Sequence, residues 1–159
     1  LFPMVDSVEQ LEEILRHLQA ARESLKRDKM EFDPQVRVGL VIETPASVIL
    51  SRELAEKVDF FHIDTNDLVQ YALAVDRQNP RVNSYYNTRH PAVMRMIEMV
   101  IDAAHTAGIK VTVSGDMADD ERMLGWFIRT GVDGFNVSAA SGLPLRRRIR
   151  SLDLGEPLC

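Results

Sequence analysis

The sequence predicts an α/β fold, and three observations lead to that prediction. Short apolar segments rich in β-branched residues alternate about five times with segments whose apolar residues recur at helical spacing. Such alternation is typical of βαβ units and of a parallel sheet. A polar cluster follows each of the last four predicted strands, and parallel α/β folds keep their functional residues at the carboxyl ends of strands. These clusters are Glu43-Thr44, 64–67, 114–116 and 138–141.

Local signals place the elements of the first half of the chain. Residues 1–5 are predicted to end a strand. Ser7, with Gln10 three residues later, forms a capping box for a helix that we expect to lay one apolar face on a core. The near-continuous apolarity of 36–42 is typical of a strand buried on both faces, and Pro45 stands in the first turn of the next helix. The remaining predictions are the end of that helix at about Lys57, a strand over 58–63 and a short helix over 67–74.

The second half of the chain continues the same alternation. A polar loop over 78–89 is long enough to suggest a function. Pro91 then opens a helix that Gly108 ends. The remaining predictions are a strand over 109–114, a helix over 119–130 that Gly131 ends, a strand over 134–137 and a basic helix over 144–151.

The length limits the possible architectures. A chain of 159 residues suggests a single domain, residues 1–159. A complete (β/α)8 barrel takes about 250 residues, so this chain has room for roughly five βα units. Two architectures stay open: a doubly wound open sheet, or a partial TIM (β/α)8 barrel made of about the last five βα units. Because residue 1 is Leu, we expect the chain to be a piece of a longer protein or a trimmed one.

The composition excludes several classes of protein. A net charge of −5 gives no basic stripe for nucleic acid, so no nucleic-acid partner is predicted. The apolar runs are too short for membrane insertion, and no signal peptide is visible. The single cysteine, Cys159, rules out an internal disulfide and fits a reducing compartment, so a cytoplasmic location is expected.

Glu43 and Asp67 are the sharpest candidate pair for a metal site. Hard cations such as Mg²⁺ take one or two carboxylates, with water and substrate phosphate in the remaining positions. Two carboxylates from adjacent strand ends would meet that need. The alternative is that Asp67 caps the following helix and that Glu43 is merely solvated before Pro45.

Three further residues are candidates for substrate contacts or for chemistry. Asn66 could donate to a phosphate oxygen or could cap a helix, and Arg77 could grip phosphate with both arms or could lie on the surface. Ser114 could be a nucleophile or a proton donor. No histidine is placed by the sequence to activate it, so a turn serine is the better interpretation from the residues alone. His62 is expected to be packed or hydrogen-bonded rather than catalytic.

Six ordered blocks carry a resemblance to a known family. The blocks are "FPM", "VIETPAS", "DFFHIDTNDLVQYALAVDRQN", "HPAVMRMIEMVIDAAHTAG", "VTVSGDMADD" and "GFNVSAASGLPLRRRIR". Together they resemble the carboxyl-terminal phosphoenolpyruvate-binding barrel of the phosphoenolpyruvate–protein phosphotransferases, the first enzymes of the bacterial sugar phosphotransferase system. Pyruvate phosphate dikinase and phosphoenolpyruvate synthase share a similar "TNDL" block, but "AVDRQN" and "HPAV" are closer to the phosphotransferases.

The resemblance implies a mechanism and a set of partners. In that family the barrel holds phosphoenolpyruvate and Mg²⁺, and the phosphoryl group passes to a histidine on a separate domain and then to a small histidine-containing carrier protein. The resemblance assigns Glu43 and Asp67 to the metal, and Asn66, Asp67 and Arg77 to the substrate. It also implies a homodimer and the partial barrel.

Three departures from the family pattern predict that this chain alone is inactive. Ser114 replaces the cysteine that protonates the enolate carbon, and a hydroxyl is a far weaker acid than a thiol with its pKa of about 8.5. Asp64 replaces a glycine and adds negative charge, and one like-charge contact at ~4 Å costs about 4 kcal/mol at an effective dielectric near 20. The phosphorylated histidine domain and the first three barrel strands are lacking.

Two other functions compete with a phosphotransferase. A non-catalytic or regulatory paralogue would explain both Ser114 and Asp64, because each change damages the chemistry and leaves the fold intact. A carbon–carbon lyase of the wider barrel superfamily would use the same carboxylates to stabilise an enolate, but the "AVDRQN" block argues against it.

Overall fold

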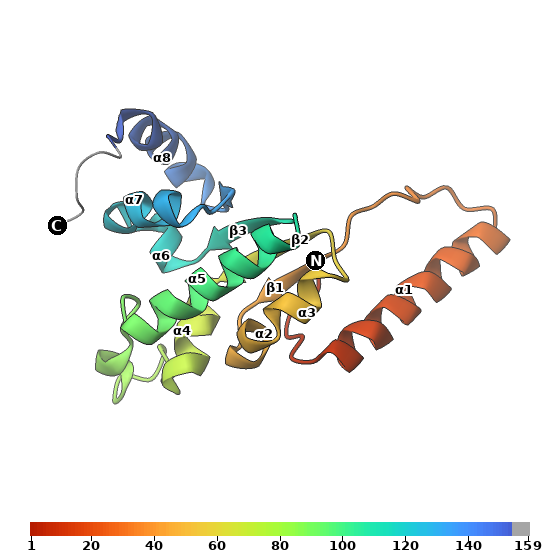
Figure 1. Cartoon of the computed structure of the whole chain (residues 1–159), viewed down its shortest axis with the longest axis horizontal. Coiled ribbons are helices and arrows are strands. Elements are labelled where there is room, and N and C mark those ends of the chain that lie inside the picture. Colours follow the sequence, from red (N-terminus) through yellow and green to blue (C-terminus); the bar gives the residue numbers. More distant parts are fainter. Residues whose placement is uncertain (154–159) are drawn as a thin grey trace.

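The computed structural model describes residues 1–153, and it contains one sheet of four parallel strands (Figure 1). Cys159 lies outside the described residues, so the predictions that rest on it, no internal disulfide and a reducing compartment, stay predictions. The strand order follows the chain order, β1-β2-β3-β4. The strands are β1 (Gly39–Ile42), β2 (Phe60–Asp64), β3 (Lys110–Ser114) and β4 (Gly134–Phe135).

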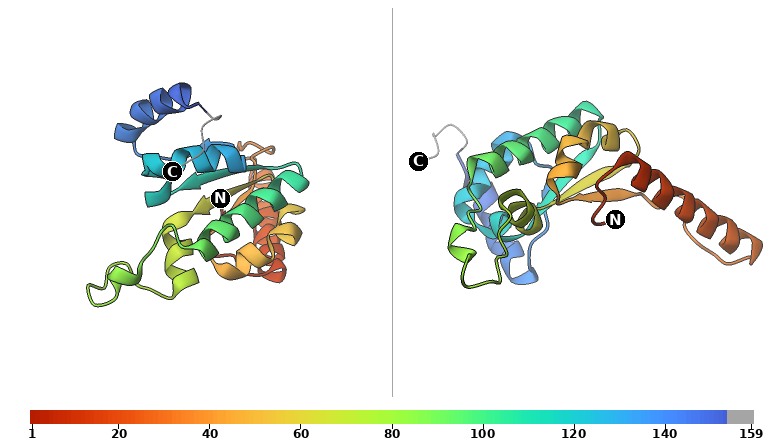
Figure 2. Two further views of the ribbon diagram at one scale, coloured as in Figure 1. Left: turned by 60° about the vertical axis from the view of Figure 1, so that its left-hand side comes forward. Right: turned by 90° about the horizontal axis from the view of Figure 1, so that it is seen from below.

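The consecutive strand order decides between the two architectures. A doubly wound sheet reverses its strand order at a switch point, whereas a (β/α)8 barrel adds each strand beside the previous one. Because βαβ crossovers are right-handed, consecutive addition places the crossover helices on one face of the sheet. Helix α5 lies across the strands on that face (Figure 2), as expected for a segment of a barrel wall.

The helices differ from the predicted ones mainly at their ends and breaks. The segment after Pro45 forms two short helices, because Leu50 ends the first and begins the second. The helix predicted over 119–130 begins two residues later, after its cap Asp120, and a short helix that ends at Asp119 was not predicted. The helices are α1 (Val8–Arg27), α2 (Pro45–Ile49), α3 (Ser51–Ala55), α4 (Thr65–Leu73), the 3-10 helix η1 (Asn83–Tyr85), α5 (Pro91–Thr106), α6 (Asp116–Asp119), α7 (Glu121–Thr130) and α8 (Ala139–Ser151).

The first predicted strand is reduced to a single parallel bridge between Phe2 and Leu40. The segment turns away because Met4 adopts a positive φ of 55° and Ser7 then caps α1. The capping box is only half formed. Ser7 accepts from the Gln10 N–H, but the Gln10 side chain accepts from Asp6 N–H rather than from Ser7.

The core lies between the sheet and its helices. The strand register aligns Leu40 with Phe61 and Phe61 with Val111, and all three side chains are fully buried. We call this side of the sheet the helix-covered face. Its other members, equally buried, are Ile42, Ile63 and Val113. Helix α5 closes this face with Val93, Ile97, Val100 and Ile101.

The alternate residues of the same strands point to the opposite side, which we call the open face. The register aligns Val41 with His62 and His62 with Thr112. Val41 and Thr112 are half-buried, and so is Ser114 at the end of β3. The open face is therefore the polar side of the sheet, corresponding to the interior of a barrel.

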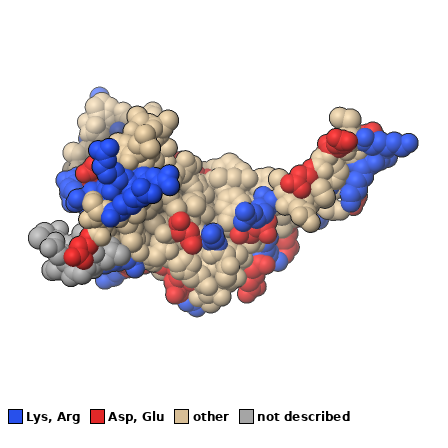
Figure 3. All heavy atoms as spheres, turned by 90° about the horizontal axis from the view of Figure 1, so that it is seen from above, with Lys and Arg blue, Asp and Glu red and all other residues tan. Residues whose placement is uncertain are grey.

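Helix α1 extends away from the sheet for most of its length (Figure 1). Leu11 is its one fully buried residue, and Val8, Ile14 and Leu15 are half-buried against the core. The expectation that one apolar face of this helix packs on a core is therefore confirmed for the first half of the helix only. Lys and Arg side chains gather over α8 and at the far end of α1 (Figure 3). Within residues 1–153, no helix combines the length and apolar character needed to cross a bilayer.

Candidate active site at the strand ends

Polar side chains from three adjacent strands meet at the carboxyl edge of the sheet. The register pairs Asp64 with Ser114, and Ile42 with Ile63, so Glu43 follows β1 beside the end of β2. Parallel strands end at one edge, and this common edge brings together residues that are far apart in the sequence. The predicted site residues at positions 43, 64, 66, 67 and 114 therefore lie in one region.

Glu43 is a buried carboxylate in contact with Asp67. Its side chain is 5% exposed, and Oε1 accepts the Met4 N–H at 2.6 Å. Burial raises the pKa of Glu43, the Met4 N–H opposes that rise, and the negative charges of Asp67 and Asp64 add to it. The Asp67 side chain lies close enough to Glu43 to contribute to this rise in pKa. The two carboxylates thus converge, and Glu43 is not the solvated residue of the alternative interpretation.

Asp64, and not Asp67, caps helix α4. Asp64 Oδ1 accepts the backbone N–H groups of Asn66 at 2.9 Å and of Asp67 at 3.2 Å. Asp67 stands in the first turn of the helix, with its side chain turned to Glu43 instead. Backbone N–H groups at a helix amino terminus are a ready site for anions. Here the protein's own carboxylate occupies two of them.

The loops after β2 and β3 are locked together around Gly115. Thr65 Oγ1 donates to the Ser114 carbonyl at 2.7 Å, and Asn66 Oδ1 accepts the Asp116 N–H at 2.8 Å. Gly115 has a φ of 93°, and a Cβ there would collide with the Thr65 hydroxyl. Asn66 is therefore not the helix cap. Because its amide oxygen faces the backbone, its amide nitrogen is the part that could donate to an anion.

Arg77 lines an open hollow of about 580 Å³. Tyr86 and Asp116 line the same hollow, and Tyr86 donates from its hydroxyl to the Asn66 carbonyl at 3.3 Å. Burial raises the pKa of Tyr86 to about 12, and the charge of Asp116 adds to the rise, while Arg77 opposes it. The charges of Asp64 and Asp67 also raise the pKa of the Tyr86 hydroxyl, which places the hollow near the acidic pair, Glu43 and Asp67.

A chain of three polar side chains crosses the open face next to Asp64. His62 is 8% exposed; its Nε2 lies 2.8 Å from Ser114 Oγ, and its Nδ1 lies 2.8 Å from Thr112 Oγ1. Burial lowers the pKa of His62, and the charge of Asp64 partly opposes that effect. The expectation that His62 is hydrogen-bonded is thus confirmed, but its contact with Ser114, which was not predicted from the sequence, places a histidine beside that hydroxyl. His62 and Asp64 in β2, with Thr112 and Ser114 in β3, carried the signal, because a parallel register aligns alternate residues.

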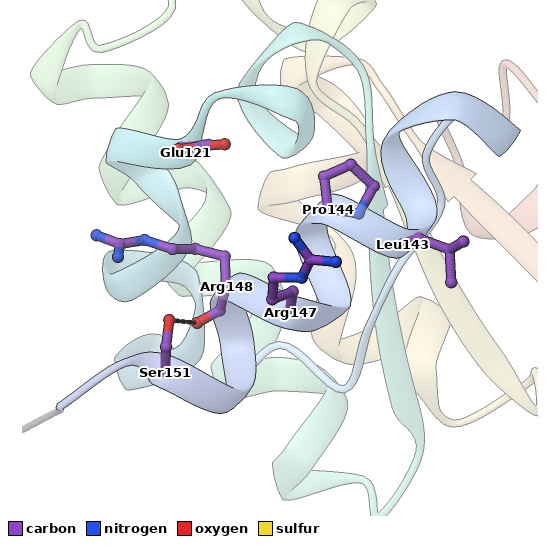
Figure 4. A pocket seen from close by; sticks show the side chains of 6 residues that line it. All are labelled: Glu121, Leu143, Pro144, Arg147, Arg148 and Ser151. Atoms are coloured by element: carbon purple, nitrogen blue, oxygen red, sulfur yellow. Dashed lines mark hydrogen bonds between the residues drawn. The ribbon is translucent and has the colours of Figure 1, made fainter.

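Another hollow, of about 520 Å³, lies between α7 and α8 (Figure 4). Arg147 and Arg148 line it together with Glu121, and Ser151 donates to the Arg148 carbonyl at 2.9 Å. It shares no lining residue with the hollow at Arg77 or with the acidic pair. Within residues 1–153, no group of three or more metal-ligating side chains is present. The pair of Glu43 and Asp67 could thus hold a cation only with other ligands completing the shell.

A protein family and two curated relatives match nearly the whole chain. The family described as "PEP-utilising enzyme, PEP-binding domain", where PEP is phosphoenolpyruvate, matches residues 1–154. The phosphoenolpyruvate-protein phosphotransferase of Haemophilus influenzae is 39% identical over 153 residues, which are 96% of this chain and 27% of that protein. The corresponding protein of Bacillus subtilis is 38% identical over 156 residues, 98% of this chain and 27% of that protein. This chain spans about a quarter of the length of these relatives.

Solved structures share the fold at low sequence identity. A citrate lyase of Burkholderia xenovorans superposes with a TM-score of 0.70 at 19% identity, covering 95% of this chain and 48% of that one. An aldolase/citrate lyase family protein of Burkholderia cenocepacia gives a TM-score of 0.53 at 22% identity, covering 74% of this chain and 41% of that one. These neighbours have TIM-barrel-like folds, and the predicted partial barrel with parallel strands is confirmed.

Proposed function

The chain belongs to the PEP-utilising enzymes, within their phosphoenolpyruvate-binding domain, and from this membership we propose that it forms part of the substrate barrel of a phosphotransferase. The protein would move the phosphoryl group of phosphoenolpyruvate to a protein histidine. The observation that carries the proposal is the convergence of Glu43 and Asp67 at adjoining strand ends. The partners implied are a histidine-phosphorylated domain, a small histidine-containing carrier protein and a second copy of the chain.

The carboxylate pair fits a magnesium ion. Mg²⁺ is held in such sites by one or two carboxylates, with the rest of its octahedron left to water and phosphate oxygens. Glu43 and Asp67 offer two hard oxygen donors. The pKa of Glu43 is raised mainly by burial and further by the charge of Asp67, and a cation between the two carboxylates would offset both effects. The bound ion would supply positive charge to offset that of the transferring phosphoryl group. The Met4 N–H would keep Glu43 oriented.

The remaining residues are assigned to different parts of the substrate. The amide nitrogen of Asn66 and the guanidinium of Arg77, which lines the hollow, could each donate to a phosphate oxygen. Ser114, at the end of β3, would stand where the substrate carbon needs a proton. Asp64 would oppose a bound anion, because it already fills the N–H groups at the start of α4. We therefore expect the chain alone to bind phosphoenolpyruvate with a dissociation constant above the low-micromolar range.

Paramagnetic broadening by Mn²⁺, used in place of Mg²⁺, tests the metal site without any need for turnover. In ¹H–¹⁵N NMR spectra of the chain, we expect Mn²⁺ to broaden the amide signals of Met4, Thr44 and Asp67 first. Glu43→Gln and Asp67→Asn should each weaken Mn²⁺ binding about tenfold or more, because each removes a ligand. Glu98→Gln is the matched control, because Glu98 is an exposed carboxylate on α5.

Calorimetric titration of phosphoenolpyruvate with and without Mg²⁺ then tests the substrate. We expect binding that requires the metal and weakens in Arg77→Ala. The basis of the proposal would be removed if Glu43→Gln left the Mn²⁺ broadening unchanged. It would also be removed if phosphoenolpyruvate bound equally well without the metal. Low-micromolar affinity in the chain alone would contradict the expected effect of Asp64.

A non-catalytic or regulatory paralogue is the second candidate, and the cap formed by Asp64 favours it. Turnover of phosphoenolpyruvate to pyruvate by the full-length natural protein separates the two candidates. A carbon–carbon lyase has less support, because the lyase structures are less than 25% identical and share only the fold.

A further inference from the structure

We propose that His62 serves the reaction as a proton reservoir, passing a proton to and from the substrate's methyl carbon through the hydroxyl of Ser114. The inference rests on the proposed function and adds a residue to it. Its geometric basis is the continuous path from Thr112 Oγ1 to His62 Nδ1, and from His62 Nε2 to Ser114 Oγ, with 2.8 Å at both steps. Ser114 stands at the strand end, level with Asp64, where the path meets the candidate site.

The relay requires that the proton of neutral His62 sits on Nδ1. In that tautomer Nδ1–H donates to Thr112 Oγ1, whose own proton can face the backbone carbonyl of Phe61 at 3.5 Å. Nε2 then keeps its lone pair and accepts the hydroxyl proton of Ser114. This neutral form suits a buried imidazole, and it is the form in which Ser114 is ready to act as a base through His62.

The proton transfer balances in both directions. When a C–H bond of bound pyruvate breaks, Ser114 Oγ takes that proton and its own hydroxyl proton moves to His62 Nε2. The products are the enolate and an imidazolium, with no change in oxidation state. In the direction of pyruvate formation, Nε2 returns its proton to Ser114, and the Ser114 hydroxyl protonates the enolate carbon. The weak acidity of a serine hydroxyl is no obstacle here, because the imidazolium is the actual acid.

Asp64 has a place in this scheme. It is the charged group that acts on His62, and its negative charge favours the imidazolium. The groups facing His62 from β3 are the hydroxyls of Thr112 and Ser114, and its register partner on β1 is Val41. The same carboxylate that opposes a bound anion therefore stabilises the charged form of the proton reservoir.

Exchange of the methyl protons of pyruvate for deuterium, followed by NMR in D2O with Mg²⁺, tests the relay in the full-length natural protein. We expect His62→Gln to slow exchange about 100-fold, as loss of a general acid–base group does. Oxalate, an enolate analogue, should bind the variant within about twofold of the unchanged protein, because a glutamine still hydrogen-bonds Ser114. Ser114→Ala should slow exchange similarly. His17→Gln, on the exposed surface of α1, is the matched control.

Two further measurements keep the outcome decisive. In the His62→Gln background, Ser114→Cys should restore exchange, because a thiol needs no imidazolium behind it. In the unchanged protein, ¹⁵N NMR should show the Nδ1–H tautomer of His62. Exchange in His62→Gln within about threefold of the unchanged protein, or an Nε2–H tautomer, overturns the relay and leaves the proposed function standing. Failure of the unchanged protein to bind oxalate with Mg²⁺ overturns the proposed function itself.

Discussion

The helix-covered face and the open face of the sheet are built from the same three long strands but carry opposite kinds of side chain. Phe61, Ile63 and Val113 on the first face are fully buried against helices. His62, Thr112 and Ser114 on the second face bond to one another through nitrogen and oxygen atoms. The comparison shows that successive residues of a strand, which point to opposite faces, serve different purposes. One set packs the core and stabilises the fold, and the other carries the polar groups of the candidate site.

Removing a large side chain from the helix-covered face should give the largest effect. We expect Phe61→Ala to lower the free energy of unfolding by about 3–5 kcal/mol, because it leaves a cavity among fully buried neighbours. Phe60→Ala removes the same ring from the open face, where the residue is half-buried, and should cost clearly less. Urea denaturation followed by circular dichroism measures both. Equal costs for the two variants would contradict the separation of the faces.

Gly115→Ala should be the next largest change, and it concerns the edge where the two faces end. The φ of 93° and the closeness of the Thr65 hydroxyl make a Cβ unfavourable, so we expect a loss of about 1–3 kcal/mol. The displaced loop should also weaken oxalate binding. Gly142→Ala is the control, since no atom lies within 4 Å of a Cβ there, and it should be neutral or slightly stabilising. Equal behaviour of both variants would show that the loops after β2 and β3 are not locked together.

Substitution of Asp64 should separate its two roles. Asp64→Ala removes the cap of α4 and should cost about 0.5–2 kcal/mol of stability. Asp64→Asn keeps a capping oxygen, so its stability should change little, while its loss of charge should strengthen metal-dependent binding of phosphoenolpyruvate. Thermal unfolding and calorimetric titration provide the two measurements. Unchanged affinity in Asp64→Asn would mean that this carboxylate does not face the bound anion.

The smallest effect expected is a pH dependence of stability from His62. Because burial lowers the pKa of His62 below its ordinary 6.5, the unfolded chain takes up a proton before the folded chain does as the pH falls. Stability should therefore decline as the pH falls from about 6.5 toward the lowered pKa, and be constant with respect to this group above 6.5. His62→Gln should remove this part of the decline in urea unfolding measured at several pH values. The same slope in both proteins would show that His62 does not titrate in this way.

Most of the fold could be predicted from local patterns. The β-branched runs ending at Ile42 and Ser114 formed strands, Pro91 opened α5, and Gly131 ended α7 with a φ of 94°. These signals are visible because steric and hydrogen-bonding preferences act within a few residues. The break at Leu50 and the four-residue helix α6 were missed, since leucine favours a helix interior and so short a helix leaves no periodic pattern.

Amphipathic spacing identified a face in α1 and in α5, yet only α5 buries most of its own. The pattern in a helix specifies which side prefers burial but carries no information on what covers that side. For the same reason the first strand, expected over 1–5, became a single bridge at Phe2. Whether this segment pairs with a neighbouring strand depends on contacts outside the segment.

By itself, the sequence determined the α/β class, the positions of the strand ends and the residue types that gather there, because each depends on short-range preferences. Only the tertiary structure decided which strands are neighbours and in what register. That register set Glu43 against Asp67 and aligned His62 with Ser114, whereas the bonds from Asp64 to the N–H groups of α4 are local. These are contacts between residues 2 to 52 positions apart, and the longer of them follow from the hydrogen-bonded pairing of strands rather than from any local pattern.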